Sequence, residues 1–171
     1  MSTVLLIAGS PSAPSRSTAI LRTMRDLAGA ARDELELLEL RALPADDLLF
    51  GKASDALTRA HKAIAQARGI VLATPVYKAA YSGLLKTFLD YLPEAALSGK
   101  RAYPIATGGS NAHLLSIDYA LKPVLSVLGA SRILEGLYLT NEAIGLRDDG
   151  TANLAAEHEA RLQTAIGELL N

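Results

Sequence analysis

The chain has 171 residues, half of them hydrophobic and a fifth charged, which is enough to bury a full core and excludes a disordered protein. Its 17 basic and 18 acidic residues leave a formal charge of -1, so the sequence lacks the strongly basic character of nucleic-acid-binding or membrane-binding proteins. Because there is no cysteine, disulfides, thiolate metal sites and cysteine nucleophiles are excluded, and any redox chemistry needs a cofactor.

The amino-terminal segment MSTVLLIAGS has no basic region, and its apolar run reaches a glycine too early for a signal peptide or a membrane span. We therefore expect a cytoplasmic protein. No linker, repeat or low-complexity tract interrupts the sequence, so we expect one domain over residues 1–171.

Five apolar segments rich in Val, Ile and Leu are expected to be strands, and each ends in turn-forming residues. They are TVLLIAG (3–9), ELELLEL (34–40), GIVLATP (69–75), RAYPIATG (101–108) and RILEGLYLT (132–140). Several are apolar at nearly every position, which is typical of parallel strands covered by helices on both faces.

Helical spacing follows these segments near residues 16–30, 54–67, 82–91, 113–129 and 153–170. Asn153 is a candidate N-cap for the last helix, and the irregular stretch 41–56 is expected to be a surface loop. The βα alternation predicts an α/β, flavodoxin-like doubly wound five-stranded parallel sheet with strand order 2-1-3-4-5 and helices on both faces. In such a sheet, ligands bind beyond the carboxyl ends of the first, third and fourth strands.

The first strand is followed by GSPSAPSRST, residues 9–18. Its candidate ligand-binding residues are Ser10, Ser15, Arg16, Ser17 and Thr18. Hydroxyl groups, a guanidinium and the free N–H groups of a starting helix together predict a cradle for a monophosphate. The loop lacks the lysine of a P-loop and the glycines of a dinucleotide-binding loop. The alternative is a Ser-Pro turn with an N-cap and no ligand.

The third strand leads into TPVYKAAYSGLLKTFLD, in which Pro75, Val76, Tyr77 and Lys78 are expected to cross the end of the sheet. Exposed backbone flanked by apolar and aromatic side chains can lie against a flat ring system. Tyr77 and Tyr81 could equally anchor a subunit interface.

The fourth strand leads into ATGGSNAH, which contains Thr107, Gly108, Gly109 and Ser110. The paired glycines are expected where backbone closely approaches another group, the alternative being an ordinary glycine turn. The three histidines of the chain fall in separate segments, so we expect no metal site.

Three stretches, AGSPSAPSRST, ATPVYKAAYSGLLKTFLDYLP and ATGGSNAHLLSIDYALKPVL, resemble the NAD(P)H-dependent FMN reductases. They are most similar to the reductase component of two-component alkanesulfonate monooxygenase systems, and the similarity extends to about residue 130. The resemblance implies a flavodoxin-like fold and reduction of FMN by NADPH or NADH. It also implies delivery of reduced FMN to a flavin-dependent monooxygenase in sulfonate-sulfur assimilation.

By position, the resemblance also assigns roles to the three loops. Ser10, Ser15, Arg16, Ser17 and Thr18 would hold the FMN phosphate, Pro75 to Lys78 would border the ring, and Thr107 to Ser110 would contact its other edge. Because the hydride passes directly from the nicotinamide to the flavin, no catalytic acid or base is expected.

The helical pattern over 113–129 contains Pro123, which cannot donate a hydrogen bond to the carbonyl of Tyr119. A π-bulge or a kink is therefore expected there. In the resembling sulfonate-system reductases, an extra tyrosine forms such a bulge at a subunit interface and accompanies FMN that dissociates as a substrate. Tyr119 matches that tyrosine; the alternative is that it packs beside a proline kink without a functional consequence.

Two other functions remain open from the residues: a quinone or azo reductase that retains FMN, and a flavodoxin-type electron carrier. Such carriers tend to be strongly acidic, and a charge of -1 argues against the latter. Long apolar helical segments such as LLKTFLDYLP favour a homodimer or a homotetramer.

Overall fold

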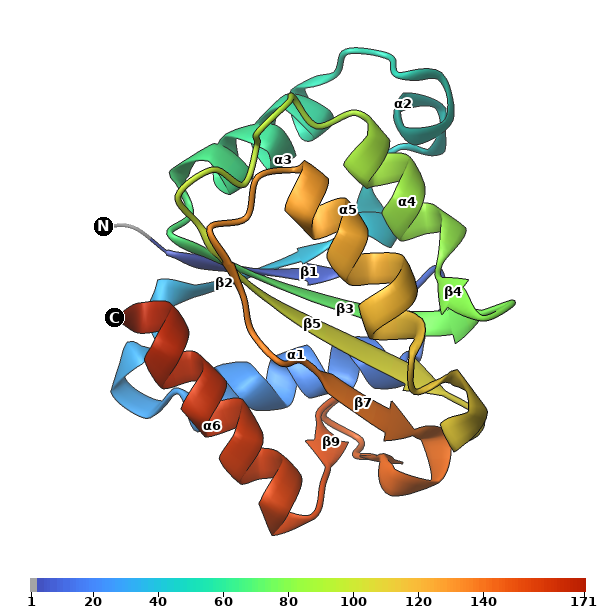
Figure 1. The fold of residues 1–171 in the computed structure, drawn as a ribbon, viewed down its shortest axis with the longest axis vertical. Helices are drawn as coiled ribbons and strands as arrows, with labels where there is room; N and C mark the ends of the chain where they lie inside the picture. Colours follow the sequence, from blue (N-terminus) through green and yellow to red (C-terminus); the bar gives the residue numbers. More distant parts are fainter. Residues whose placement is uncertain (1–2) are drawn as a thin grey trace.

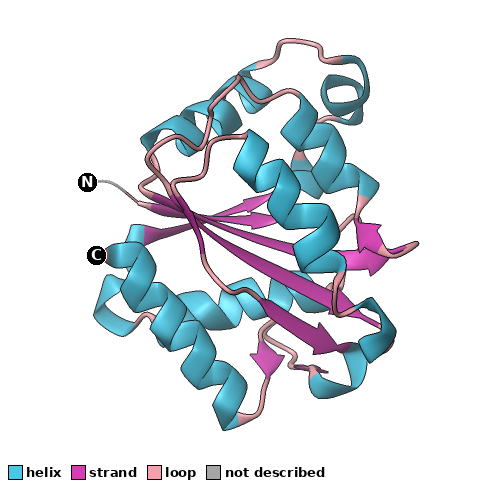
Figure 2. Ribbon diagram, in the orientation of Figure 1, coloured by secondary structure: helices cyan, strands magenta, loops and turns pink. Residues whose placement is uncertain are grey.

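The computed structural model describes residues 3–171, and in that part of the chain helices cover both faces of a central sheet (Figures 1 and 2). The sheet contains β1 (Val4–Ala8), β2 (Leu35–Glu39), β3 (Gly69–Tyr77), β4 (Ala80–Tyr81), β5 (Arg101–Gly108), β6 (Arg132–Ile133) and β7 (Leu137–Thr140). The α-helices are α1 (Arg16–Leu27), α2 (Ala45–Phe50), α3 (Asp55–Gln66), α4 (Gly83–Asp90), α5 (Lys122–Val127) and α6 (Ala156–Leu170). A separate two-stranded ribbon pairs β8 (Gly145–Leu146) with β9 (Ala152–Asn153).

Short helical turns complete the connections: the 3-10 turns η1 (Gly29–Glu34), η2 (Leu40–Ala42), η3 (Asn111–His113) and η5 (Asn141–Ala143), and the π-helix η4 (Ile117–Leu121). Among the described residues, no helix is both long enough and apolar enough to span a bilayer.

The sheet has the order β2-β1-β3-β5, after which β6 and β7 both pair with β5, and all of these pairings are parallel. This confirms the flavodoxin-like order 2-1-3-4-5. The expected number of strands was wrong, because the described sheet has seven rather than five. The short β4 adds an antiparallel pair to the end of β3, and the expected fifth strand is divided into β6 and β7.

Pro104 explains the division of the fifth strand. The carbonyl of Ala102 accepts a hydrogen bond from Leu134 N–H at 2.9 Å, so the backbone of Ala102, and two residues later that of Pro104, faces this strand. Pro104 has no N–H to continue the ladder. Opposite it, Gly136 adopts φ +92°, and a Cβ at Gly136 would lie 2.9 Å from the Pro104 carbonyl oxygen. The chain therefore bulges between β6 and β7.

Alternate residues of each central strand supply two separate cores. Leu6 packs with α1 and α6 on one face, whereas Leu5 and Ile7 pack with α3, α4 and α5 on the other. All five residues of β1 are buried. The near-continuous apolar runs in the sequence thus have the expected cause, since both faces of the sheet are covered by helices (Figure 1).

Two local expectations were wrong. Residues 45–50 form α2 inside the stretch expected to be a loop, with acidic residues in the first turn and Gly51 in the left-handed conformation after the last residue. Asn153 does not cap the last helix, because it pairs with Gly145 in the small ribbon and α6 begins after Ala155.

Candidate functional site

The first loop leaves the sheet in close contact with β3 and α4. Gly9 N–H donates to the Ala73 carbonyl at 2.8 Å, and the Ser82 hydroxyl donates to the Gly9 carbonyl. A Cβ on Gly9 would lie 2.9 Å from the Cβ of Leu85. Glycine is needed here because α4 packs directly against the start of the loop.

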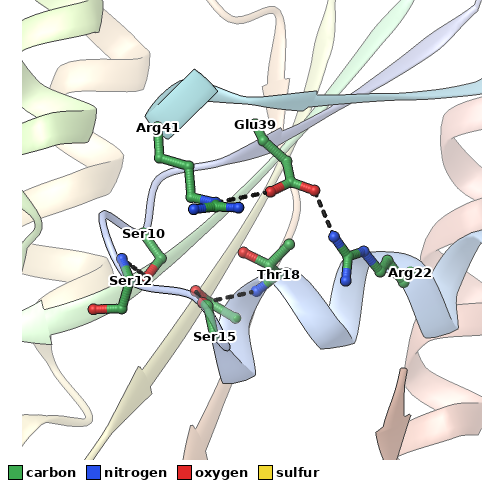
Figure 3. A network of polar contacts seen from close by, with 8 residues as sticks. Ser10, Ser12, Ser15, Thr18, Arg22, Glu39 and Arg41 are labelled. Atoms are coloured by element: carbon green, nitrogen blue, oxygen red, sulfur yellow. Dashed lines mark hydrogen bonds and ion pairs between the residues drawn. The ribbon is translucent and has the colours of Figure 1, made fainter. Parts of the chain in front are cut away.

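Serine side chains then fix the path of the chain into α1 (Figure 3). The Ser10 side chain is buried and its hydroxyl oxygen accepts from Ser12 N–H at 3.2 Å. Ser15 is the N-cap of α1, where its hydroxyl oxygen accepts from Thr18 N–H at 3.3 Å and lies 3.1 Å from the Ser17 hydroxyl oxygen. These contacts aim the free N–H groups of the first turn of α1 toward the loop.

Arg16 is the first residue of α1 and its side chain is exposed. A cation at a helix N-terminus opposes the helix dipole, and α1 has no acidic residue in its first turn to balance it. An arginine in this place costs stability to the free protein. A bound anion would offset that cost and would also receive the N–H groups of the helix end.

The third loop is a tight hairpin at the end of β3. Val76 pairs with Tyr81 and Tyr77 with Ala80, so only Lys78 and Ala79 form the turn. The Thr74 hydroxyl oxygen accepts from Ser82 N–H at 2.9 Å, which holds the base of the hairpin against the start of α4. The Tyr77 side chain is about half exposed at 48%.

The hairpin turn stores backbone strain that glycine would relieve. Lys78 and Ala79 have φ values of +50° and +67°, as a two-residue type I′ turn requires, although neither is a residue that favours this conformation. The variant Ala79→Gly is expected to raise the free energy of unfolding by about 1 kcal/mol. Denaturant unfolding measures this. As a control, Ala80→Gly in β4 should lower stability, since it adds chain freedom without relieving a positive φ. If both variants destabilise the protein equally, the turn at Lys78 and Ala79 is not strained.

In the fourth loop the two glycines have different surroundings. A Cβ on Gly108 would collide with the hydroxyl of Tyr138, which donates to the Ser110 carbonyl at 2.5 Å. Burial raises the pKa of Tyr138, so this hydroxyl keeps its proton and remains a donor. Gly108 therefore makes room for Tyr138. Gly109 has no atom within 4 Å of a Cβ position and faces open space.

The three loops meet in one cleft of about 220 Å³. Most of the predicted ligand-binding residues line it: Ser10, Ser15, Arg16, Pro75, Val76, Tyr77, Thr107, Gly108 and Gly109. Among its lining residues in the described chain, Arg16 alone is charged. The cleft thus combines hydroxyl groups, one cation, a helix N-terminus and an aromatic ring.

The structure does not bring every predicted residue to the cleft. Ser17 and Thr18 are buried in the first turn of α1, and neither they nor Lys78 and Ser110 line it. Three residues that the prediction did not select do line it, namely Ser12, Pro14 and Asn141. Ser12 and Pro14 lie within the quoted first loop. Asn141 follows β7, so the end of the fifth strand was the available signal.

The expected disturbance at Pro123 is a π-helix over Ile117–Leu121, which confirms that prediction. Lys122 N–H donates to the Ile117 carbonyl, five residues back. The expected single helix over 113–129 is accordingly divided into η3, η4 and α5. The Tyr119 side chain is 79% exposed, and the next turns also expose Val127 at 83%.

The model of the NADPH-dependent FMN reductase family matches residues 2–144. The chain belongs to this family. It is therefore an oxidoreductase of the flavin reductase type, whose chemistry uses FMN and a nicotinamide nucleotide.

Individual relatives extend the match over nearly the whole reductase. An FMN reductase (NADPH) of Escherichia coli (strain K12) is 46% identical over 167 residues, which cover 95% of this chain and 85% of the relative. An enzyme of the same name from Pseudomonas putida (strain KT2440) is 43% identical over 166 residues, covering 95% and 84%. Among solved structures, the apo form of an NADH:FMN oxidoreductase, EMOB, superposes with a TM-score of 0.82 at 36% identity, covering 99% of this chain and 88% of its own.

Proposed function

We propose that the cleft at the ends of β1, β3 and β5 binds FMN, with chain 1–171 acting as one flavin-binding unit. The observation that carries this proposal is the convergence of the three loops on a single cleft whose charged lining residue in the described chain is Arg16. Arg16, the Ser10 and Ser15 hydroxyls and the start of α1 would hold the phosphate. Residues Pro75 to Tyr77 would border one part of the ring, and Thr107 to Gly109 another.

The size of the cleft favours a flavin that is only partly enclosed. Its volume of about 220 Å³ is below the range of roughly 300–1,000 Å³ typical of pockets that enclose a drug-sized ligand. One face of the ring would remain open to a nicotinamide. Bound FMN would supply the chemistry by accepting a hydride from NADPH or NADH. The protein residues then bind and orient the two nucleotides, and no acid or base side chain is assigned.

We further propose that FMN dissociates after reduction and is delivered to a flavin-dependent monooxygenase, in sulfonate-sulfur assimilation in the cytoplasm. Three features support this. The cleft, at about 220 Å³, is too small to enclose a flavin, Tyr119 lies in a π-helix, and the surrounding sequence resembles the reductase component of alkanesulfonate monooxygenase systems. A reductase that must release its product benefits from a site that encloses only part of it, because less contact area has to be given up.

The surface formed by α4, η4 and α5 is proposed as the interface of a homodimer or homotetramer. It contains a groove of about 430 Å³ between α4 and α5, lined by Leu89, Pro123, Val124 and Val127 among others. The i,i+4 ion pairs Lys86–Asp90 and Lys122–Asp118 present both charges on these helices. A surface with both charges can match a second copy of itself about a twofold axis.

Steady-state assay of the purified protein tests this function. The protein is expected to be colourless after desalting and to oxidise NADPH or NADH when FMN is added. A lack of FMN-dependent nicotinamide oxidation would overturn the reductase assignment. A yellow protein that keeps its flavin through desalting and reduces quinones or azo compounds would instead favour the flavin-retaining alternative.

A further inference from the structure

A second, smaller recess lies on the other side of the first loop, and three arginines line it. They come from separate parts of the chain: Arg22 from α1, Arg41 from η2 and Arg147 from the residue after β8. The recess has a volume of about 70 Å³. It shares Ser12, Pro14 and Ser15 with the cleft proposed for FMN. The two sites are therefore adjacent, separated by residues 12–15.

The arginines outnumber the acid among them. Glu39 lies between Arg22, whose Nη2 is 2.6 Å from its Oε1, and Arg41, whose Nε is 3.1 Å from its Oε2 (Figure 3). Burial raises the pKa of Glu39, but the hydrogen bonds and charges of the two arginines outweigh this effect and lower the pKa overall. Glu39 is thus ionised. Within the described chain it is the single carboxylate lining the recess, and the lining residues carry a surplus of two positive charges.

The turn between β8 and β9 forms the wall of the recess that contains Arg147 and Gly150. Arg147 Nη2 donates to the Asn153 side-chain oxygen at 3.1 Å. Gly150 adopts φ +81°, and a Cβ at that position would lie 2.5 Å from Nη1 of Arg22. Glycine lets the turn close directly onto the Arg22 guanidinium. The nearby Asp149 does not line the recess. Hydrogen bonds from the Thr151 hydroxyl and Thr151 N–H lower the pKa of its carboxyl, with a smaller contribution from the charge of Arg147, so Asp149 offsets part of the positive charge at this wall.

Bringing three guanidinium groups together costs free energy unless an anion joins them. Guanidinium groups match phosphate oxygens in pairs, so a phosphomonoester, with close to two negative charges, fits the surplus charge. The recess is too small for a flavin or a purine ring. It can take a single phosphate group.

A neighbouring hollow indicates what the phosphate is attached to. Arg41 also lines an apolar hollow of about 520 Å³ between η2, α2 and α4, which includes Leu43, Leu48 and Leu84. This volume has room for a purine, and Pro11 of the first loop forms part of its wall. An aromatic base beside a phosphomonoester is the chemistry of the adenosine end of NADPH, where the phosphate is on the ribose 2′-oxygen.

We propose that the recess formed by Arg22, Arg41 and Arg147 binds the ribose phosphomonoester of NADPH, with its adenine in the adjoining hollow, so that these arginines favour NADPH over NADH. The inference rests on the proposed function, because it needs the nicotinamide end of the same molecule to reach the FMN cleft. The shared residues Ser12, Pro14 and Ser15 place the two sites next to each other, on the two sides of the first loop.

The variant Arg41→Gln tests this proposal through the ratio of KM for NADPH to KM for NADH. Arg41 is the suitable position for two reasons. Its side chain is 42% exposed, and Glu39 keeps its ion pair with Arg22 when Arg41 is replaced. The ratio is expected to rise by about tenfold or more, as for loss of a hydrogen bond between charged groups, and Arg41→Lys should restore part of it. The matched control is Arg32→Gln, which removes an exposed arginine paired with Asp26 at the other end of α1. An unchanged ratio in Arg41→Gln would overturn the proposal.

Binding measurements without turnover separate the sources of the phosphate. By calorimetry, adenosine 2′-phosphate is expected to bind the wild-type protein more tightly than adenosine 5′-phosphate or inorganic phosphate does, and Arg41→Gln should remove that preference. Equal binding of inorganic phosphate would mean a free-phosphate site and would overturn the nucleotide assignment. A weaker affinity for FMN in Arg41→Gln, at an unchanged nucleotide ratio, would assign the recess to the flavin phosphate instead. If the wild-type protein reduces FMN with either nucleotide, failure of these tests leaves the reductase function standing.

Discussion

The variant Arg16→Ala is expected to bind FMN roughly tenfold to a hundredfold more weakly than the wild type, because the flavin phosphate loses its charged partner. Arg16 is exposed, lies at the first position of α1 and lines the cleft where the three loops meet. Fluorescence titration of FMN measures the affinity. An affinity equal to that of the wild type would mean that Arg16 and the first loop do not bind the flavin phosphate.

The stability of ligand-free Arg16→Ala provides a second measurement, in which the variant is expected to do as well as the wild type or better. Removing a cation from a helix N-terminus is expected to leave the free energy of unfolding unchanged or to raise it by about 0.3–1 kcal/mol. The matched control is Arg25→Ala, in the last turn of the same helix, where a cation favours the helix dipole. This control should lower stability slightly and leave FMN affinity as it was. Weaker FMN binding in Arg16→Ala therefore cannot be attributed to a damaged fold.

The variant Tyr119→Ala is expected either to retain flavin through desalting or to change the mass of the oligomer. Tyr119 exposes most of its side chain from the π-helix, and a buried aromatic side chain removes about 150–250 Å² of surface from water. If the surface of η4 and α5 forms the interface, loss of this ring changes both the assembly and the helix that borders it. Light scattering after gel filtration gives the mass, and absorbance gives the flavin content.

The conservative variant Tyr119→Phe separates the ring from its hydroxyl. It keeps the aromatic area and should behave as the wild type does in both measurements. If Tyr119→Ala also matches the wild type in mass and in flavin content, the role assigned to this helix is wrong.

The order of the sheet could be predicted because the strands carry a strong physical signal. Residues of β1 and β3 are buried on both faces, so their apolar character is nearly continuous. The strand number could not be predicted as easily, because the β3–β4 turn uses Lys78 and Ala79 in place of the usual glycine or asparagine. The division of the expected fifth strand into β6 and β7 depends on Pro104, which belongs to the neighbouring strand β5, so the segment itself carries no sign of it.

Other features had local signals that the sequence interpretation did not use. The segment Ala45–Phe50 has Pro44 before it, acidic residues in its first turn and Gly51 after it, all typical of a short helix. Asp149 and Gly150 form a turn between two short strands, which places Asn153 in a ribbon and away from the start of α6.

For the site, the sequence predicted which loops meet but not what each residue contacts. The pair Gly108 and Gly109 was expected to admit a close neighbour, and at Gly108 that neighbour is Tyr138 of β7, a different strand. That contact depends on tertiary packing, which no local pattern of residues contains. Ser17 is buried, and its hydroxyl oxygen lies 3.1 Å from that of the N-cap residue Ser15.

The interruption opposite Pro104 also affects how copies of this molecule can associate. The outermost position of the sheet on that side is occupied by two short pieces, of two and four residues, set out of line by the bulge. An uninterrupted row of unpaired amides and carbonyls would be a template for adding strands from another chain. Here that template is broken, so the addition of a strand from another molecule is disfavoured at this edge of the sheet.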